Sequence, residues 1–553
     1  SQDSPRHVEV IYADEIQSNP VHSVSDVLRY ISSVDVMQRG VFGIQSDVGI
    51  RGGGFEHTLI LLNGMRINDP QTGHHNLNIP LSLTDIERIE IIPAGTGLYY
   101  SAGSFGGVIN IVTRSESDKT FGGIFSIGSD GYINGLASLS LKKDDIRFNL
   151  SAHSQKGNGY RLNTDFETKS FQMNMDTKVL SLFAGYTDKR FGANGFYTLR
   201  YPLQWENTKT TVLSGRLKTK ISDVVFEPSI LYRHGYDYYI LDRSNPDFYK
   251  NTHRTNVINT LLPFQYGYKN KTINFGMDMS FDSIDSTRLG KHHRDYQAIF
   301  VGITDKTDKI IASIDARIDR FSQLDRLEFS PSMAIAYKLS DDVKFRAAFN
   351  RSFRLPSYTE LYYTSPVHRS NPNLKPETAY NLEAGMDFSK DYISSKFTIF
   401  KRWGTDIIDW VKAGDMWVSE NIDKLDTIGL TLGTQLYINP KNILKIDYTW
   451  LDQDNEINRQ TTYGNYLRHK VSLILSSKLS KAINNNIAVT HQKRLNQSSF
   501  TLVDFKTIKH VKLDNLDINM FLEGKNVFNK GYYDFVGLPM PGRTLFLGLT
   551  ISI

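Results

Sequence analysis

Residues 312–319 read Ala-Ser-Ile-Asp-Ala-Arg-Ile-Asp, so that every second side chain is apolar and the others are serine, aspartate or arginine. Successive side chains of a β-strand point to opposite faces, so this stretch predicts a strand with one apolar and one charged face. A soluble β-sandwich buries its apolar face against a second sheet. A transmembrane barrel instead turns the apolar face to lipid and the charged face to a wet or plugged lumen. The density of charge favours the barrel.

The same alternation recurs from about residue 120 to the end of the chain. Clear examples are residues 343–350, 444–450, 516–523 and 544–553. Tyrosine and tryptophan near predicted strand ends, among them Trp410, Tyr448 and Trp450, are typical of the aromatic girdles at a membrane interface.

Composition agrees with a barrel and argues against several other classes. The chain has 553 residues, and no stretch approaches the ~18 apolar residues of a membrane-spanning helix. Its mean hydropathy is −0.35, as expected when apolar and polar residues alternate. A formal charge of +5 does not indicate nucleic-acid binding, and the absence of cysteine excludes disulfides and thiolate metal sites. No catalytic motif is present, so we do not expect an enzyme.

The first ~115 residues have a different character and predict a small mixed α/β domain. Residues 25–31 have apolar positions at helical spacing after a good N-cap. Residues 59–62 form a short apolar strand that runs into Asn63-Gly64, a turn signal. Two further strands are predicted at 87–92 and 107–112. The glycines that follow Arg51 resemble a phosphate loop, but we favour a tight turn.

Several motifs in a fixed order resemble the TonB-dependent receptor family. The motifs that resemble the plug of that family are residues 25–36 (SDVLRYISSVDV), 50–52 (IRG), 59–66 (LILLNGMR), 86–92 (IERIEII) and 102–114 (AGSFGGVINIVTR). The motifs that resemble the family's barrel are residues 353–377 (FRLPSYTELYYTSPVHRSNPNLKPE) and residues 523–543. The second of these stretches contains KNVFNKGYY and GLPMPGR. Each motif is weak alone, but together they span essentially the whole chain.

The resemblance implies an all-β transmembrane barrel of about 22 antiparallel strands with an N-terminal mixed α/β plug inside its lumen. It places the plug at residues 1–116 and the barrel at 117–553, in the bacterial outer membrane. That leaves about 20 residues for each strand with its connection, of which a spanning strand needs ~9–11, so most extracellular loops are expected to be short. The implied function is active import of a scarce, large nutrient, driven by TonB.

Three departures from the family pattern affect these expectations. The family usually has Arg-Gly-Pro after the IERIE-type strand, where this chain has Pro93-Ala94-Gly95. We therefore expect Arg51 to supply the contact between plug and barrel glutamates. The chain ends in Ile553 rather than the aromatic residue often found in the family. No TonB box precedes residues 7–11, so TonB is expected to bind a segment upstream of Ser1.

Two polar, turn-rich plug loops are predicted to contact the ligand. The candidate residues on loops 39–45 and 68–78 are Arg39, Phe42, Gln45, Asn68, Gln71, His74, His75, Asn76 and Asn78. The His74-His75 pair could ligate haem iron or a metal, since imidazole is a common metal ligand. The alternative, which we favour, is a hydrogen-bonding pair on a loop tip, and no metal site or cofactor is predicted.

Aromatic residues of the barrel are the second group of ligand candidates, because tyrosine and tryptophan offer a large rigid surface with a polar tip. The group consists of Tyr197, Tyr201, Trp205, Tyr238 and Tyr362, with His368 at a position where haem receptors of the family carry a functional histidine. An interfacial belt or loop packing is the equally weighted alternative. Asp452, Asp454 and Glu456 could bind calcium, but a solvated acidic turn is favoured.

The nutrient is suggested by likeness alone. Residues 192–197 (GANGFY) and 406–429 are most similar to BtuB-type cobalamin transporters. Cobalamin or a related corrinoid is therefore the first choice, haem or a ferric siderophore the second, and a peptide or glycan the third. A passive porin or adhesin is the alternative of another class, against which the plug motifs argue. Whether a surface lipoprotein caps the barrel is left open by the sequence.

Overall fold

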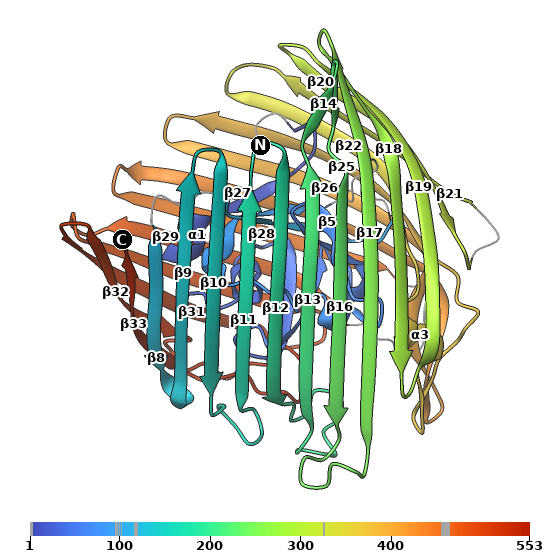
Figure 1. Ribbon diagram of the computed structural model, residues 1–553, viewed down its shortest axis with the longest axis vertical. Coiled ribbons are helices and arrows are strands. Elements are labelled where there is room, and N and C mark those ends of the chain that lie inside the picture. Colours follow the sequence, from blue (N-terminus) through green and yellow to red (C-terminus); the bar gives the residue numbers. More distant parts are fainter. Residues whose placement is uncertain are drawn as a thin grey trace.

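The computed structural model describes residues 4–93, 98, 100, 102–115, 120–323, 327–454 and 465–553. It consists of a closed β-barrel and an N-terminal domain that lies inside it, drawn in blue behind the front wall of strands (Figure 1). None of the described helices is long and apolar enough to cross a membrane.

The N-terminal domain, called the plug below, is built around a five-stranded mixed sheet in the order β1-β6-β7-β4-β5. A separate hairpin pairs β2 with β3. Its strands are β1 (Glu9–Tyr12), β2 (Val34–Gly40), β3 (Gln45–Ile50), β4 (Thr58–Leu62), β5 (Met65–Arg66), β6 (Ile86–Ile92) and β7 (Gly107–Thr113). Its helices are α1 (Ala13–Ser18), α2 (Val24–Arg29) and the 3-10 turns η1 (Phe55–His57), η2 (Gly73–His75) and η3 (Leu83–Asp85).

Local sequence signals explain the plug's turns and helix ends. Asn63 and Gly64 have φ angles of 51° and 79°, the geometry that lets a two-residue turn join β4 to β5. The predicted strands at residues 59–62, 87–92 and 107–112 are present with small differences at their ends. The helix expected over residues 25–31 begins earlier, because Ser23 is its N-cap and its Oγ accepts from the Asp26 N–H at 3.3 Å.

The barrel closes with 22 antiparallel strands among the described residues, because β33 pairs with β8. The strands are β8 (Phe121–Gly128), β9 (Tyr132–Lys143), β10 (Ile146–Gly157), β11 (Phe166–Asp176), β12 (Leu180–Gly192), β13 (Trp205–Leu217), β16 (Ser229–Ile240), β17 (Lys250–Tyr268), β18 (Lys271–Ser286), β19 (Gly290–Lys306), β20 (Ile310–Phe321), β21 (Leu327–Lys338), β22 (Val343–Arg354), β25 (Glu377–Lys390), β26 (Ile393–Ala413), β27 (Met416–Asn439), β28 (Asn442–Asp454), β29 (Leu467–Lys478), β30 (Ile483–Arg494), β31 (Phe500–Leu513), β32 (Leu516–Lys525) and β33 (Thr544–Ser552).

Short elements interrupt the connections between these strands. They are the 3-10 turn η4 (Ser129–Gly131), the hairpin β14 (Thr219–Ile221) and β15 (Val224–Phe226), the helix α3 (Tyr358–Tyr362), and β23 (Thr364–Ser365) with β24 (His368–Arg369).

The polarity of the barrel wall is the reverse of a soluble sandwich, as predicted. In β20 the apolar Ile314 is 66% exposed on the outside, whereas Arg317 and Asp319 have no exposed surface because they face the plug. The Arg317 Nε donates to Asp319 Oδ1 at 2.9 Å, so the two buried charges pair with each other away from water. The predicted fold class, a plugged transmembrane barrel, is confirmed.

The two ends of the barrel differ. The terminal rim is the end where β8 starts and β33 ends, joined by a hydrogen bond from Thr120 N to Ile553 O of 2.7 Å. The opposite end, the loop rim, carries the connections 129–131, 158–165, 193–204, 241–249, 355–376 and 526–543. The last plug strand ends at Thr113 and the first barrel strand begins at Phe121. The predicted boundary between residues 116 and 117 lies outside the described residues and stays a prediction.

Candidate functional site

The plug loop 39–45, between β2 and β3, lies under the loop rim. The Arg39 guanidinium donates to the Phe196 carbonyl of the barrel and pairs with Asp47 of the plug at 3.3 Å. The same guanidinium lies 4.2 Å from the ring centroid of Phe535, in a connection of the loop rim. Arg39 is thus held by contacts from two barrel connections.

A hydrogen-bonded chain leads from this loop to the barrel wall. The Gln45 Nε2 donates to the Tyr197 hydroxyl at 2.8 Å, and that hydroxyl donates to Glu206 Oε2 at 2.7 Å. The structure therefore brings together two residues named from the sequence, Gln45 and Tyr197, with one that sequence reasoning missed. Glu206 lies at the start of β13 and is 1% exposed.

The plug loop 68–78 reaches the neighbouring part of the wall. The Gln71 Nε2 donates to Asp237 Oδ2 of β16 at 3.1 Å. The Asn78 Oδ1 accepts from Lys189 Nζ of β12 at 2.9 Å. Two polar side chains of one loop therefore hold two barrel strands.

Two other candidates of this loop shape its backbone instead of facing the lumen. Asn68 accepts from the Ile60 N–H at 2.8 Å and donates to the Thr58 carbonyl at 2.9 Å. Asn76 accepts from the Asp69 N–H at 2.9 Å. Asn68 is thus bonded to β4 and the Asn76 carbonyl oxygen to the loop itself, while both residues also line the second cavity described below.

The adjacent histidines turn to different partners. The His74 Nδ1 lies 2.6 Å from Asp47 Oδ1, and its ring stacks on Phe55 with 4.2 Å between centroids. The His75 Nε2 lies 3.4 Å from Asp237 Oδ2. Burial lowers the pKa of His74, although Asp47 opposes this. Burial also acts to lower the pKa of His75, but the hydrogen bond and charge of Asp237 outweigh it and raise that pKa to about 9. The pair therefore does not converge on one ligand.

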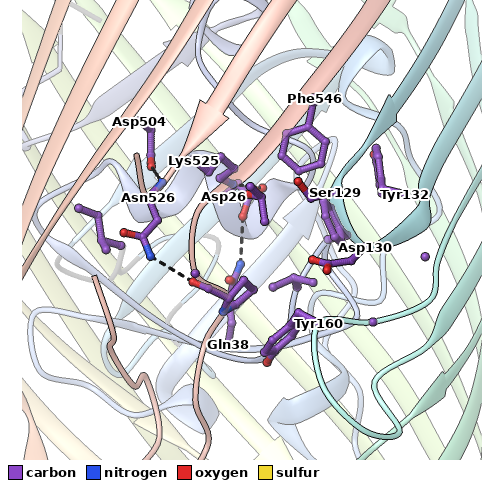
Figure 2. Close-up of a pocket in the computed structure, with 18 of the residues that line it drawn as sticks. Asp26, Gln38, Ser129, Asp130, Tyr132, Tyr160, Asp504, Lys525, Asn526 and Phe546 are labelled. Atoms are coloured by element: carbon purple, nitrogen blue, oxygen red, sulfur yellow. Dashed lines mark hydrogen bonds and ion pairs between the residues drawn. The ribbon is translucent and has the colours of Figure 1, made fainter. Parts of the chain in front are cut away.

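An aromatic pocket of about 60 Å³ opens beside loop 39–45, near the place where the barrel closes between β33 and β8 (Figure 2). Phe42 stacks on Tyr132 and Phe166, with ring centroids 4.5 and 5.2 Å away. The polar side of the pocket is ordered by Gln38, whose Nε2 donates to Asp26 Oδ1 at 3.1 Å. The pocket combines ring faces with carboxylates, a lining suited to an amphipathic ligand.

A second cavity, of about 130 Å³, lies between loop 68–78 and the connection 355–376. Here α3 folds down onto the plug. The Tyr358 N–H donates to the Pro70 carbonyl at 3.0 Å, and the Thr359 N–H donates to the Gln71 carbonyl at 3.1 Å. These backbone hydrogen bonds join a connection of the loop rim directly to plug loop 68–78, which together with loop 39–45 is called the plug apex.

The remaining lumen-side candidates lie further out on the loop rim. Tyr362 stacks on His292 with 3.6 Å between centroids. His368 lies between the rings of Tyr363 and Trp410, and no contact with a plug residue is found for it in the described part of the chain. Tyr201 packs on Phe248 at 6.1 Å.

Trp205 and Tyr238 lie on the outer face of the wall. They neighbour Glu206 and Asp237, which face the lumen, and successive residues of a strand point to opposite sides. Their rings approach each other at 6.4 Å. This placement fits the interfacial belt that was the alternative for these aromatics.

Asp452 is satisfied by local partners. It accepts from the Tyr466 hydroxyl at 2.7 Å and pairs with Arg468 at 3.3 Å. Glu456 of the same acidic stretch lies outside the described residues. Ala94 and Gly95, which follow the IERIE-type strand where the family usually has Arg-Gly-Pro, lie outside them as well.

Arg51 connects plug and barrel through a buried ion pair. Its Nη1 donates to Glu383 Oε2 of β25 at 2.9 Å, and both side chains are almost fully buried. The guanidinium also lies 4.3 Å from the ring centroid of Phe400. Arg51 is the residue for which the sequence predicts a contact with barrel glutamates, and Glu383 is the glutamate it contacts here.

We expect Arg51→Ala to loosen the plug strongly, because it leaves a buried carboxylate without its main partner. The cost of breaking such a pair is about 3–5 kcal/mol, here toward the lower end because Arg346 also acts on Glu383. Hydrogen exchange of β1 to β7 in detergent should accelerate accordingly. The matched control is Arg88→Ala, which removes a 31% exposed guanidinium from pairs with Glu87 and Glu90 and should cost at most about 1 kcal/mol. Equal exchange in both variants would contradict the expected role of Arg51.

Further buried ion pairs between plug and barrel were missed by sequence reasoning. They are Asp26–Lys525 at 2.9 Å, Asp35–Arg494 at 2.7 Å, Asp69–Arg233 at 2.7 Å and Arg29–Asp534. Two plug histidines also contact barrel glutamates, His22–Glu523 at 2.7 Å and His57–Glu377 at 2.9 Å. The signal that could have suggested them is the charge on the lumen-facing positions of the strands. Without the strand register, however, no charge can be assigned its partner.

The buried carboxyl group of Glu56 should make the docking of plug loop 68–78 depend on pH. It lines the second cavity, and burial together with the charge of Glu360 raises its pKa to about 8. A carboxyl group whose pKa is higher in the folded state than in the unfolded state stabilises the fold at low pH and loses this effect as pH rises through the folded pKa. Docking of loop 68–78 should therefore weaken by about 1–3 kcal/mol between pH 5 and 8. Hydrogen exchange of residues 70–76 at both pH values measures this, and Glu56→Gln should abolish most of the difference.

Comparison with known proteins agrees with this architecture. The protein-family model "TonB-dependent Receptor Plug Domain" matches residues 1–108, and the family model "TonB dependent receptor-like, beta-barrel" matches residues 103–526. The chain therefore belongs to the TonB-dependent receptor family, a family of outer-membrane receptors and transporters.

Individual relatives differ in what they carry. The vitamin B12 transporter BtuB of Photobacterium profundum is 23% identical over 95% of this chain and 89% of its own length. The siderophore receptor PirA from Acinetobacter baumannii has a TM-score of 0.79 at 17% identity, covering 99% of this chain and 98% of its own. The copper transporter OprC has a TM-score of 0.85 at 14% identity, with full coverage of both chains. The solved structures of PirA and OprC have the same fold as this chain.

Proposed function

We propose that this receptor imports cobalamin or a related corrinoid across the outer membrane. The observation that supports this choice most is the likeness to a vitamin B12 transporter along nearly the whole chain, at 23% identity over 95% of its length. The nutrient is captured from outside and released toward the periplasm when TonB, energised from the inner membrane, acts on the segment before the plug.

The proposed ligand surface is the loop-rim side of the plug with the wall around it. A corrinoid has a broad apolar ring with polar amide substituents, so it needs ring faces and hydrogen-bonding groups together. The aromatic pocket contributes the rings of Phe42 and Tyr132, which stack on each other in the structure. Arg39, Gln71 and His75 are the polar candidates on the plug, although each is bonded to a neighbour in the structure.

The first test is direct. Detergent-purified receptor is mixed with cyanocobalamin and separated by gel filtration, and the visible spectrum of the protein peak is recorded. We expect the corrinoid bands to co-elute at a ratio near one to one. A peak without these bands, together with no corrinoid-dependent growth when the receptor replaces a host's own transporter, would overturn the proposal.

The same assay discriminates the alternatives. Haem would give a Soret band in the protein peak, and its loss in His368→Ala would identify that side chain as a contributor. A ferric siderophore would bring iron into the peak without either spectrum. A surface lipoprotein that caps the loop rim would co-purify with receptor extracted from its native membrane.

A further inference from the structure

We infer that His75, Glu206 and Asp237 form a binding site for a divalent transition-metal ion between the plug apex and the barrel wall. The three side chains come from η2, β13 and β16, and their ligand atoms lie within 4.8 Å of one another. Glu206 is opposite Tyr239 and Thr208 is opposite Asp237, so the two carboxylates are diagonal neighbours on the lumen face. This inference does not depend on the corrinoid proposal.

The carboxylates are buried and incompletely bonded. Glu206 is 1% exposed and Asp237 is 8% exposed. One oxygen of each accepts a hydrogen bond from a neutral donor, Tyr197 or Gln71. The other oxygens, Glu206 Oε1 and Asp237 Oδ1, have no hydrogen-bond partner among the described residues. Unbonded carboxylate oxygens away from water are costly, and two side by side also repel. A cation between them removes both costs.

Apart from His75, which is protonated below its raised pKa and releases that proton when its nitrogen binds an ion, the protein's own cations nearby are bonded elsewhere. Lys189 Nζ donates to the Gly43 carbonyl and to Asn78 Oδ1. Arg39 holds the Phe196 carbonyl and Asp47. Arg233 donates to Asp69. His75 itself presents one nitrogen to the pair, at 3.4 Å from Asp237 Oδ2, which is the oxygen already bonded by Gln71. The free oxygens are therefore left for a bound ion.

The donor set defines the kind of ion. One imidazole nitrogen and two carboxylates suit Zn²⁺, Co²⁺, Mn²⁺ or Fe²⁺, whereas Cu⁺ prefers sulfur ligands and Ca²⁺ needs six to eight oxygens. Ligands at about 2.0–2.2 Å from zinc lie roughly 3.3–3.6 Å apart in a tetrahedron. Side-chain movements of about 1 Å bring the three ligand atoms to that spacing, and water can supply the remaining position.

Neighbouring groups orient the ligands. Asn78 contacts His75 Nδ1 at 3.3 Å, which leaves Nε2 turned to the wall. A small cavity of about 10 Å³, which His75 and Asp237 line, is close to the size of one water molecule. Since His75 belongs to the plug and the carboxylates to the barrel, an ion at this site bridges the two domains.

The test uses the full-length receptor in detergent after chelator treatment. Titration with ZnCl₂ should show one tight site per chain, and CoCl₂ should give visible ligand-field bands. His75→Ala and Glu206→Gln should each weaken Zn²⁺ binding by about 100-fold or more. His234→Ala is the matched control, because His234 lies on the same strand as Asp237 but on the opposite face, and binding should change less than about twofold.

Hydrogen exchange gives an independent readout of location. Zn²⁺ should slow exchange of residues 70–78 in the unchanged receptor and in His234→Ala, but not in His75→Ala. Folding of each variant is checked by heat-dependent mobility in gel electrophoresis. Absence of Zn²⁺, Co²⁺ and Mn²⁺ binding to the unchanged receptor would overturn the inference, and so would tight binding that survives in both His75→Ala and Glu206→Gln. Cyanocobalamin co-elution is scored separately on the same samples.

Discussion

A chain that lacks residues 1–115 will form an open, ion-conducting pore in a planar bilayer, whereas the chain with these residues will show no resolvable current. A barrel of 22 strands has a lumen far wider than its own side chains can fill, so the plug is what seals it. The plug core, with Leu28, Val34 and Ile50 wholly buried, is a packed domain, so we expect it to block the passage of water and ions.

The shortened chain should still fold as a barrel. Its lumen-facing charges Arg317, Lys470 and Arg494 each contact the plug, and we expect them to become hydrated when it is removed. No plug strand of the described residues takes part in the pairing from β8 to β33, and the plug adds only an isolated bridge from Ala102 to Phe353 of β22. Heat-dependent gel mobility verifies folding before conductance is measured. If the folded, shortened barrel were as tight as the complete receptor, the sealing role of the plug would be refuted.

Import will stop when the plug is covalently tied to the wall. A Cβ placed on Gly185 of β12 lies 3.0 Å from Pro80 Cβ of the plug, near the separation of about 3.5–4.5 Å that a disulfide needs. The chain has no native cysteine, so Pro80→Cys with Gly185→Cys can form one disulfide only. In the oxidised form we expect uptake to fall to the level of cells without the receptor.

Reduction should restore import in the double variant. Each single variant serves as a control for the effect of the substitution itself, and neither should respond to oxidant. Ligand binding at the loop rim should survive oxidation, because the tie restricts movement of the plug and leaves the apex intact. Undiminished uptake by a quantitatively oxidised double variant would show that transport does not require the plug to move at this point.

Much of the fold is predictable from the sequence because it depends on local patterns. Alternation such as that of residues 312–319 predicts both the strand and which face meets lipid. The Asn63-Gly64 pair predicts its turn, since few residues tolerate two successive positive φ angles. The start of α2 is less well determined by the sequence, because Ser23 and Ser25 are both acceptable N-caps, and the structure uses Ser23.

The site is less predictable because it depends on register and closure. Nothing in the sequence places Glu206 and Asp237 beside each other, since their proximity follows from the pairing of β13 with β16 across an intervening hairpin. The outward placement of Trp205 and Tyr238 follows from the same register. The plug loops were recognised by composition, but their partners on the wall were not.

The two peptide hydrogen bonds from α3 to Pro70 and Gln71 have a mechanical consequence. Because they involve main-chain groups only, they are insensitive to most substitutions in either segment and act as a short tether. Tension applied to the plug from the periplasmic side is transmitted through this tether to a segment exposed at the cell surface. In that case, one movement of the plug both loosens the residues around the ligand and opens the path beneath it.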